Sequence, residues 1–274
     1  MSLLRVIVCV KVVPRPEEVK VNPATHTLDR VNARNMVNPP DMNALEIALD
    51  LKDKHGAWVG VVTMGPKFFE DYMRMTLMMG ADAAYILSDR GFAGADTLAT
   101  TYVLAKGIEK ANGADVVLCG EESSDGATGQ VPQGIAEWLN YAQVTNVVSL
   151  AWLPDQGRIE TKRELEGGWE VLRARLPAVC AVRAGVNEPR FLDFRRATLA
   201  RAAEAPVAVW SASDLGCDPA LIGVPGSPTV AVQLKELPRR ERKRERIAGS
   251  PDEAARALAL KLKAWLMPPE RAAK

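Results

Sequence analysis

Continuous apolar runs and amphipathic segments alternate along the first half of the chain. Four apolar runs are rich in β-branched residues, as strands buried on both faces of a sheet are, and they span residues 4–13, 57–65, 83–89 and 114–120. Each run is followed by a segment with apolar residues at helical spacing, and these segments span residues 38–56, 66–80, 95–112 and 130–140. Asn38 is the predicted cap of the first of these helices. This alternation predicts an α/β fold, in which a parallel-core sheet is flanked by helices.

After residue 141 the pattern changes to strand-like stretches separated by polar turns. Three such stretches span residues 143–153, 157–165 and 169–185. The Gly167–Gly168 pair between the last two indicates a hairpin. We expect these strands to join the same sheet as antiparallel or mixed additions. Residues 187–205 are then predicted to form a loop that leads into a helix.

The C-terminal part of the chain has its own composition. Residues 211–230 are rich in Gly, Pro and Ser and indicate a linker, and residues 238–246 are a run of charges, either a solvated arm or a contact to a partner. Residues 250–267 predict a helix that starts with a capping box of Ser250 and Glu253. Its apolar stripe must be buried in the core or on another subunit, and it consists of Leu258, Leu262, Trp265 and Leu266.

Composition restricts the class of protein. The 274 residues carry a formal net charge of +1, with 47% hydrophobic and 25% charged residues, as globular proteins do. The near-zero charge argues against a nucleic-acid-binding surface over the whole protein. No apolar run reaches the roughly 18 residues of a membrane-spanning helix, and residues 1–16 lack the features of a secretory signal, so we expect a cytoplasmic protein.

Thiol and metal chemistry have little support in the sequence. The cysteines are widely spaced and form no CxxC pair, which predicts reduced thiols in the core. They are Cys9, Cys119, Cys180 and Cys217. The two histidines, His26 and His55, have no ligand-like partners at close spacing. We therefore expect neither a metal site nor a histidine-based catalytic triad.

The stretch "GEESSDGATGQ", residues 120–130, joins an apolar strand to a helix with more glycine and more donors than a turn requires. The N–H groups of a helix start, the close backbone approach that glycine permits and a threonine hydroxyl together favour an anion or nucleotide phosphate. A polar turn before a capped helix is the other interpretation. Neither a P-loop nor a G-x-G-x-x-G pattern is present. Strand ends at residues 9–14 and 63–66 are expected to converge on the same crevice, because ligands of parallel sheets lie beyond the carboxyl ends of the strands.

Motifs along nearly the whole chain resemble the β subunit of electron transfer flavoprotein. They are "RVIVCVKVVP", "NPPDMNALEIALDLK", "VVTMGP", "GFAGADTLATTYVLA", "GEESSDGATGQV", "LPAVCAVRAGVNEPRF" and the late "GSPT". The resemblance implies a fold of the adenine-nucleotide alpha hydrolase-like, Rossmann-like type. It also implies a heterodimer with an α subunit that carries FAD, and a β-subunit pocket that holds AMP or, in the bifurcating branch, a second FAD.

By position, the resemblance places nucleotide-binding residues at the three strand ends and at the start of two helices, with the phosphate over residues 126–130. The predicted set is Cys9, Lys11, Asn38, Pro39, Pro40, Asp41, Met64, Thr97, Thr100, Gly120, Ser123, Asp125, Gly126, Thr128, Gly129 and Gln130. Thr97 and Thr100 would serve as donors to a flavin.

The stretch "NEPRFLDFRR" resembles the family's recognition loop, which docks on acyl-CoA dehydrogenases. The resemblance places the apolar anchor at Phe194, beside Arg190 and Arg195, although Phe194 could also be an ordinary core residue. Glu164 matches a glutamate that the family links to mobility of the flavin domain, or it is a charge on a strand surface. We therefore expect a nucleotide-binding domain over residues 1–210, with the recognition loop at residues 185–200. A C-terminal linker, arm and helix over residues 211–274 would pack on the partner subunit.

The predicted function is electron transfer without catalytic residues of the chain's own, because a bound flavin supplies redox chemistry. The β subunit would help to pass electrons from an acyl-CoA dehydrogenase to an acceptor such as a quinone oxidoreductase. Two alternatives are a bifurcating subunit whose own FAD accepts hydride from NADH, and an AMP- or ATP-binding regulatory module. The "SSDGATGQV" loop and "GSPT" resemble the longer branch that includes bifurcating members. Arg15, however, stands where those members commonly have an acid.

Overall fold

The computed structural model describes residues 3–15, 34–202, 204–229, 241–242 and 244–266. In this described part, a nine-stranded sheet has the order β11-β5-β4-β1-β6-β10-β7-β8-β9. Neighbouring strands from β11 to β7 pair in parallel, and β8 and β9 are added antiparallel. The parallel core and the mixed additions predicted from the sequence are thus confirmed. The bounds are β1 Arg5–Cys9, β4 Trp58–Met64, β5 Ala83–Leu87, β6 Val116–Gly120, β7 Ala142–Leu153, β8 Arg158–Leu165, β9 Gly168–Arg175, β10 Ala178–Val182 and β11 Val207–Trp210.

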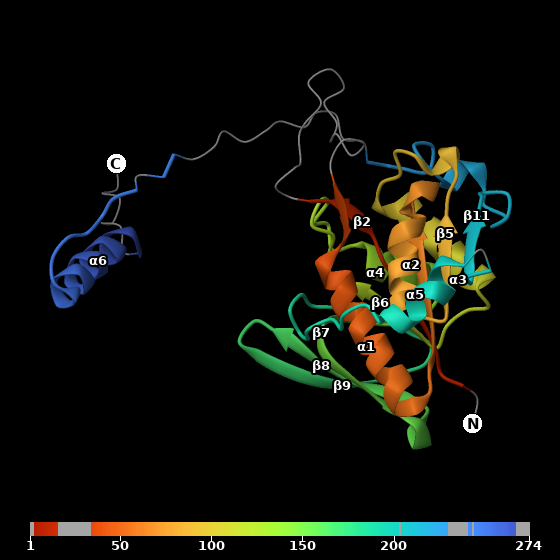
Figure 1. Ribbon diagram of the computed structural model, residues 1–274, viewed down its shortest axis with the longest axis horizontal. Helices are drawn as coiled ribbons and strands as arrows, with labels where there is room; N and C mark the ends of the chain where they lie inside the picture. Colours follow the sequence, from red (N-terminus) through yellow and green to blue (C-terminus); the bar gives the residue numbers. More distant parts are fainter. Residues whose placement is uncertain (1–2, 16–33, 203, 230–240, 243, 267–274) are drawn as a thin grey trace. The chain divides into compact units, whose positions relative to one another are not determined.

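Helices cover both faces of this sheet (Figure 1). The helices α1 (Pro39–His55), α2 (Glu70–Met79) and α5 (Ala197–Arg201) pack on one face, and α3 (Thr97–Lys110) and α4 (Val131–Leu139) pack on the other. Alternate residues of one strand enter the two cores. In β1, Val6 and Val8 face the α1 side, and Ile7 and Cys9 face the α3 side. Each of these strands is buried on both faces of the sheet, and its sequence is therefore a continuous apolar run.

Two predicted strands are each divided in the structure. The apolar run 4–13 gives β1 and a separate β2 (Val12–Pro14), which pairs with β3 (Asn35–Val37). The chain leaves the large sheet at Lys11, because its N–H donates to Asp41 instead of continuing the ladder. The run 169–185 is divided between β9 and β10 at Pro177, which has no N–H for a ladder hydrogen bond. The single strands predicted there are wrong.

The segment predicted as a linker is largely part of the folded body. Residues 211–229 lie within the first of two compact units, residues 1–235. Leu215 and Ile222 are buried in the core on the α3 side, and the Asp218 N–H donates to the Tyr102 hydroxyl at 2.9 Å. The Gly and Pro residues here serve turns, including a short 3-10 helix at Pro219–Leu221. Composition alone did not distinguish packed turns from a linker.

Residues 236–274 form the second unit, whose described part contains the helix α6 (Pro251–Leu266). The predicted capping box is confirmed: the Ser250 N–H donates to Glu253 Oε2 at 2.8 Å, and the Glu253 N–H donates to Ser250 Oγ at 3.4 Å. No residue of α6 is buried. Part of the charge run at 238–246 lies outside the described residues. Among the described residues, no helix combines the length and the apolar character needed to cross a membrane.

Candidate functional site

The carboxyl ends of β4, β1 and β6 lie side by side at one edge of the sheet. This follows because β1 pairs in parallel with β4 on one side and with β6 on the other. From β1 the chain continues to β4 in one direction, and β6 is added in the opposite direction, so the strand order reverses here. Ligands of open α/β sheets bind at such reversal points. The strand ends that the sequence predicts to converge are therefore neighbours.

Asn38, directly before α1, holds the loop that follows β6. Its Nδ2 donates to the Glu122 carbonyl at 2.9 Å, and its Oδ1 accepts from the Ser124 N–H at 3.0 Å. The sequence predicts Asn38 as a capping residue, and that is only half right. Asn38 occupies the N-cap position, but its side chain makes no capping hydrogen bond. Pro39 and Pro40 follow as the first helical residues, where the lack of an N–H costs nothing.

Asp41 connects the ends of β1 and β6 through one buried carboxyl group. Its Oδ2 accepts from the Lys11 N–H at 2.7 Å, and its Oδ1 accepts from the Gly120 N–H at 3.0 Å. Burial raises the pKa of Asp41 to about 7, although hydrogen bonds from Lys11, Asn38 and Gly120 act in the opposite direction. Both strand ends therefore depend on the position of this one side chain.

Lys11 neutralises the acid inside the loop. Its Nζ donates to Asp125 Oδ1 at 2.5 Å and to Ser123 Oγ at 3.1 Å. The Asp125 side chain is only 3% exposed, so its negative charge depends on a nearby cation for compensation. The loops after β1 and β6 are thus joined by side chains as well as through Asp41.

The backbone of the same loop contains two residues in the left-handed conformation that occurs in anion-binding concavities. Ala127 and Gly129 both have positive φ, at 45° and 61°, and N–H groups arranged around such residues can converge on an anion. Among the described residues, none accepts a hydrogen bond from the N–H of Thr128 or Gly129. A Cβ on Gly126 would lie 3.2 Å from Ser123 Oγ and 3.8 Å from Lys11 Nζ, so glycine keeps the backbone near the lysine accessible.

The starts of α3 and α4 meet beside this loop. Thr97 Oγ1 donates to Gln130 Oε1 at 2.9 Å, which joins the first residue of α3 to the residue before α4. Thr100 lies in the first turn of α3, and in the described part of the chain its side chain is not hydrogen-bonded to any other predicted site residue. Met64 ends β4 half-buried on the same face of the sheet as Cys9. The hydrogen bond between Thr97 and Gln130 therefore places both residues at the site, whereas no such contact among the described residues connects Thr100 to it.

The cysteines are free thiols, and three of them are buried on strands. Cys9 and Cys119 are neighbours in register on β1 and β6. The Cys9 thiol and burial together raise the pKa of Cys119, and burial raises the pKa of Cys180 to about 12. Protonated, covered thiols are poor nucleophiles. The predicted interpretation as core thiols is confirmed for Cys9, Cys119 and Cys180, whereas Cys217 is only half-buried against the core on the α3 side.

A cluster of charges lies next to the site. Arg183, directly after β10, forms ion pairs with Glu164 on β8 and, at 3.4 Å, with Glu121 after β6. Glu121 Oε1 also accepts from the Ala184 N–H at 3.0 Å. Glu164 is therefore paired within this chain, and the negative charge of Glu121 at the start of the loop is partly compensated.

The side chains predicted to dock a partner have different environments. Phe194 is 78% exposed, so it is not a core residue. Arg195 is exposed and bonds to Asp193, whereas Arg190 forms ion pairs with Glu46 and Asp53 on α1. The role of Arg190 within this chain is to hold the loop. No sequence spacing indicates this contact, because Glu46 and Arg190 are 144 residues apart.

One further contact at the site was not predicted from the sequence. Asp96 caps α3 through the N–H groups of Leu98 and Ala99, and its other oxygen accepts from the Thr229 N–H at 3.0 Å and the Thr229 hydroxyl at 2.7 Å. The Asp96 N–H donates to Ser227 Oγ at 2.8 Å. The "GSPT" segment therefore lies against the start of α3. Its Ser and Thr are a visible signal for caps and turns, but nothing in the sequence identifies their partner.

Together, the parallel-core sheet and the polar loop at its reversal point define a Rossmann-like α/β protein with an anion-compatible site. The profile of the electron transfer flavoprotein domain matches residues 25–215 of the chain. FixA of Azorhizobium caulinodans is 43% identical over 240 residues, which cover 84% of each protein. Subunit CarD of the caffeyl-CoA reductase-Etf complex of Acetobacterium woodii is 41% identical, over 82% of this chain and 85% of CarD. The electron transfer flavoprotein β subunit of Clostridium acetobutylicum is 39% identical over the same shares.

The chain belongs to the electron transfer flavoprotein β-subunit family. The resemblance on which the predicted fold and role rested is thereby confirmed, and the α/β architecture agrees with it.

Proposed function

We propose that this chain is the nucleotide-holding and docking subunit of a flavoprotein heterodimer. An α subunit would carry FAD, an acyl-CoA dehydrogenase would supply electrons, and an acceptor such as a quinone oxidoreductase would receive them. The observation that carries the proposal is the loop 120–130, which Asn38, Asp41 and Lys11 hold at the strand reversal point.

The residues of this loop fit a nucleotide phosphate. The positive-φ backbone at Ala127 and Gly129 suits an anion, as do the N–H groups of Thr128 and Gly129, for which the described residues supply no acceptor. Lys11 compensates Asp125 and would lie beside the phosphate. FAD or AMP could occupy such a pocket, and FAD would supply one- or two-electron redox chemistry. What the chain itself contributes is a cradle of backbone N–H groups, together with a lysine whose charge offsets the repulsion between Asp125 and a phosphate.

Nucleotide content is the test of this proposal. We expect the heterodimer, purified with the α subunit from the adjacent gene, to release either one FAD and one AMP, or two FAD, on heating. The first result identifies a plain electron carrier. The second identifies a flavin in this chain, and bleaching by NADH would then support the bifurcating alternative. A stable monomer that binds AMP or ATP and forms no flavin-containing complex would contradict the proposal.

The substitution Lys11→Met makes the same test specific to the pocket. It removes the Lys11–Asp125 ion pair and the ammonium group beside the proposed phosphate site, so we expect the affinity for the pocket nucleotide to fall by about tenfold or more, roughly 1.4 kcal/mol. Lys54→Met is the matched control, since the ion pair of Lys54 within the described part of the chain is with the exposed Asp50 on α1. Equal retention of nucleotide by the two variants would place the phosphate elsewhere.

We also propose that α6 packs on the α subunit. Among the described residues of its own unit, nothing covers an apolar stripe on one face of this helix, formed by Leu258, Leu262, Trp265 and Leu266. Contiguous apolar surface of this kind marks an interaction site. Removal of residues 249–274 is expected to weaken heterodimer association at least about tenfold, measured by analytical ultracentrifugation. Unfolding of the separate β subunit serves as the control and should not change. Unaltered association would contradict this role.

A further inference from the structure

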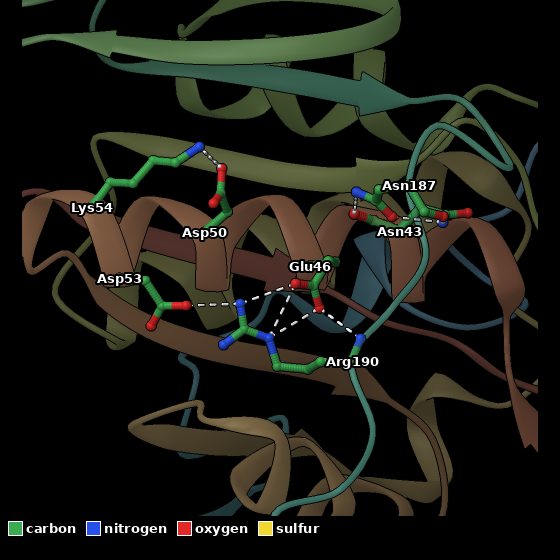
Figure 2. A network of polar contacts seen from close by, with 7 residues as sticks. All are labelled: Asn43, Glu46, Asp50, Asp53, Lys54, Asn187 and Arg190. Carbon is green, nitrogen blue, oxygen red and sulfur yellow. Dashed lines mark hydrogen bonds and ion pairs between the residues drawn. The ribbon is translucent and has the colours of Figure 1, made fainter.

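The recognition loop is held against α1 at its beginning by a pair of asparagines. The Gly185 N–H donates to Asn43 Oδ1 at 3.0 Å, and Asn43 Nδ2 donates to the carbonyl and the Oδ1 of Asn187, both at 2.8 Å. Asn187 Nδ2 returns a bond to the Asn43 carbonyl at 3.1 Å. Figure 2 shows the side-chain amide of Asn43 on α1 facing the side-chain amide of Asn187 on the loop. Asn43 is buried, so these bonds replace contacts with water.

Glu46, one turn further along α1, holds the next part of the loop. Its two oxygens accept from the backbone N–H of Arg190 at 2.8 Å and from the guanidinium at 2.9 to 3.1 Å. Asp53 adds an ion pair to the same guanidinium at 2.9 Å (Figure 2). Charge-assisted bonds that fork in this way fix geometry as well as adding energy. The main chain at Arg190 is therefore fixed by a side chain of α1.

The far end of the loop is held by α2. Arg74 donates to the carbonyls of Ala200 and Ala202, at 2.5 and 3.0 Å, and these groups lie at the end of α5. The Asp193 N–H donates to the Met78 carbonyl at 3.1 Å. A segment with both ends bonded to rigid helices has lost most of its conformational freedom before any partner binds.

Between these two attachments three large apolar side chains face solvent, whereas Leu192 packs against the core. Phe191 is 97% exposed and Leu199 is 73% exposed, and Phe194 is exposed as well. The exposed Arg195, Arg196 and Arg201 surround them, with Asp193 as the acid within the segment. Exposed aromatics beside arginines are the residue types that carry binding energy at protein interfaces. The net positive rim suits a partner whose apolar pocket is lined by carboxylates.

We infer that Glu46 and Arg74 are positioning residues for docking: they fix both ends of the recognition loop so that Phe191 and Phe194 enter an acid-rimmed apolar pocket on the electron-donating protein. The inference rests on the proposed docking role of the loop. It assigns Phe191 as a second anchor beside Phe194. It also explains why Arg190 is turned towards α1 and not towards a partner.

Hydrogen exchange in the intact heterodimer tests the positioning role without any partner. Glu46→Ala is compared with Asp50→Ala, a change one turn further along α1 at a residue that forms an ion pair with Lys54 and, among the described residues, no polar contact with the loop (Figure 2). We expect exchange of the Arg190 amide, which donates to Glu46, to rise about tenfold or more in the first variant and to stay at the wild-type rate in the second. Chymotrypsin cleavage after Phe191 and Phe194 should accelerate in parallel. Should Glu46→Ala fail to yield heterodimer, Glu46→Gln, which keeps an acceptor but removes the charge, gives the same readout with a smaller change.

Kinetics then test the docking part. The heterodimer is titrated as substrate of an acyl-CoA dehydrogenase from the same genome, with its acyl-CoA as electron source. We expect Glu46→Ala to raise KM about tenfold and to leave kcat within about twofold. Phe191→Ala should raise KM with no change in hydrogen exchange, and Asp50→Ala should match wild type.

Three results would overturn the inference. One is exchange that changes less than about twofold in both Glu46 variants. Another is faster exchange with an unaltered KM, and the third is faster exchange throughout the subunit, which would indicate a general folding defect. A wild-type heterodimer that the dehydrogenase does not reduce would count instead against the proposed electron donor, and the exchange experiment would still decide the role of Glu46.

Discussion

A heterodimer that carries Gly120→Ala is expected to lose its pocket nucleotide and to be destabilised by about 2–4 kcal/mol. A Cβ at this position would lie 2.4 Å from Asp41 Oδ1, 2.7 Å from Pro40 Cβ and 2.8 Å from the Pro40 carbonyl carbon. The last of these atoms belongs to the backbone of α1 and cannot move alone. The strand end would have to shift, and the bond from the Gly120 N–H to Asp41 would lengthen or break.

Urea unfolding and nucleotide content measure this effect. Gly168→Ala is the matched control, because a Cβ there has no atom within 4 Å. It also lies at the start of β9, at the far edge of the sheet. If Gly120→Ala unfolded at the same urea concentration as Gly168→Ala and kept its nucleotide, the packing of Gly120 against α1 would not support the pocket.

The substitution Asp41→Asn is expected to have the second large effect on stability and nucleotide binding. The carboxyl group accepts from the N–H groups of Lys11 and Gly120. An asparagine has one acceptor oxygen, so its NH2 group would face one of these donors without a partner. We expect the folded state to lose about 2 kcal/mol at pH 5, and the pocket nucleotide to dissociate more readily.

The pH dependence of the same variant has a definite sign. Burial raises the pKa of Asp41 from 3.8 to about 7. Between these values the unfolded chain releases a proton that the folded chain retains, so the stability of wild type falls as pH rises through this range, by at most about 1.4 kcal/mol per pH unit. Asp41→Asn lacks this contribution. The stability difference between wild type and variant should therefore shrink from pH 5 to pH 7, as measured by urea unfolding at each pH. Parallel curves for the two proteins would contradict a raised pKa.

The parallel core was predictable because it depends on a pattern that is local in sequence. Strands buried on both faces need continuous apolar runs, and the runs at 57–65, 83–89 and 114–120 coincide closely with β4, β5 and β6. The end of β1 was not predictable. The apolar run continues past Lys11, and only the carboxyl group of Asp41, which is 30 residues away, takes the chain out of the sheet.

In the candidate site, too, some features follow from the sequence and others depend on contacts between distant residues. The convergence of the strand ends follows from topology, and Lys11, Asp125 and Asn38 were among the predicted residues. Their individual bonds were not predictable, because Asn38 contacts Glu122 across 84 residues and so depends on the packing of α1 against the end of β6. The capping role expected of Asn38 was reasonable locally, and a tertiary contact replaced it. Glu46 carried no signal in the sequence, since a glutamate on an amphipathic helix is usually solvated, whereas here its side chain is only 15% exposed.

The position of β10 has a consequence for how the sheet is completed during synthesis. β10 lies between β6 and β7, although β7, β8 and β9 all precede it in the chain. A nascent chain that has reached β9 therefore has a gap in the middle of its sheet, and the facing edges of β6 and β7 remain unpaired. Unpaired edges readily pair with other chains. The interval between the synthesis of β7 and the insertion of β10 is thus when this subunit is most prone to aggregate, and chaperone binding should matter most at that stage.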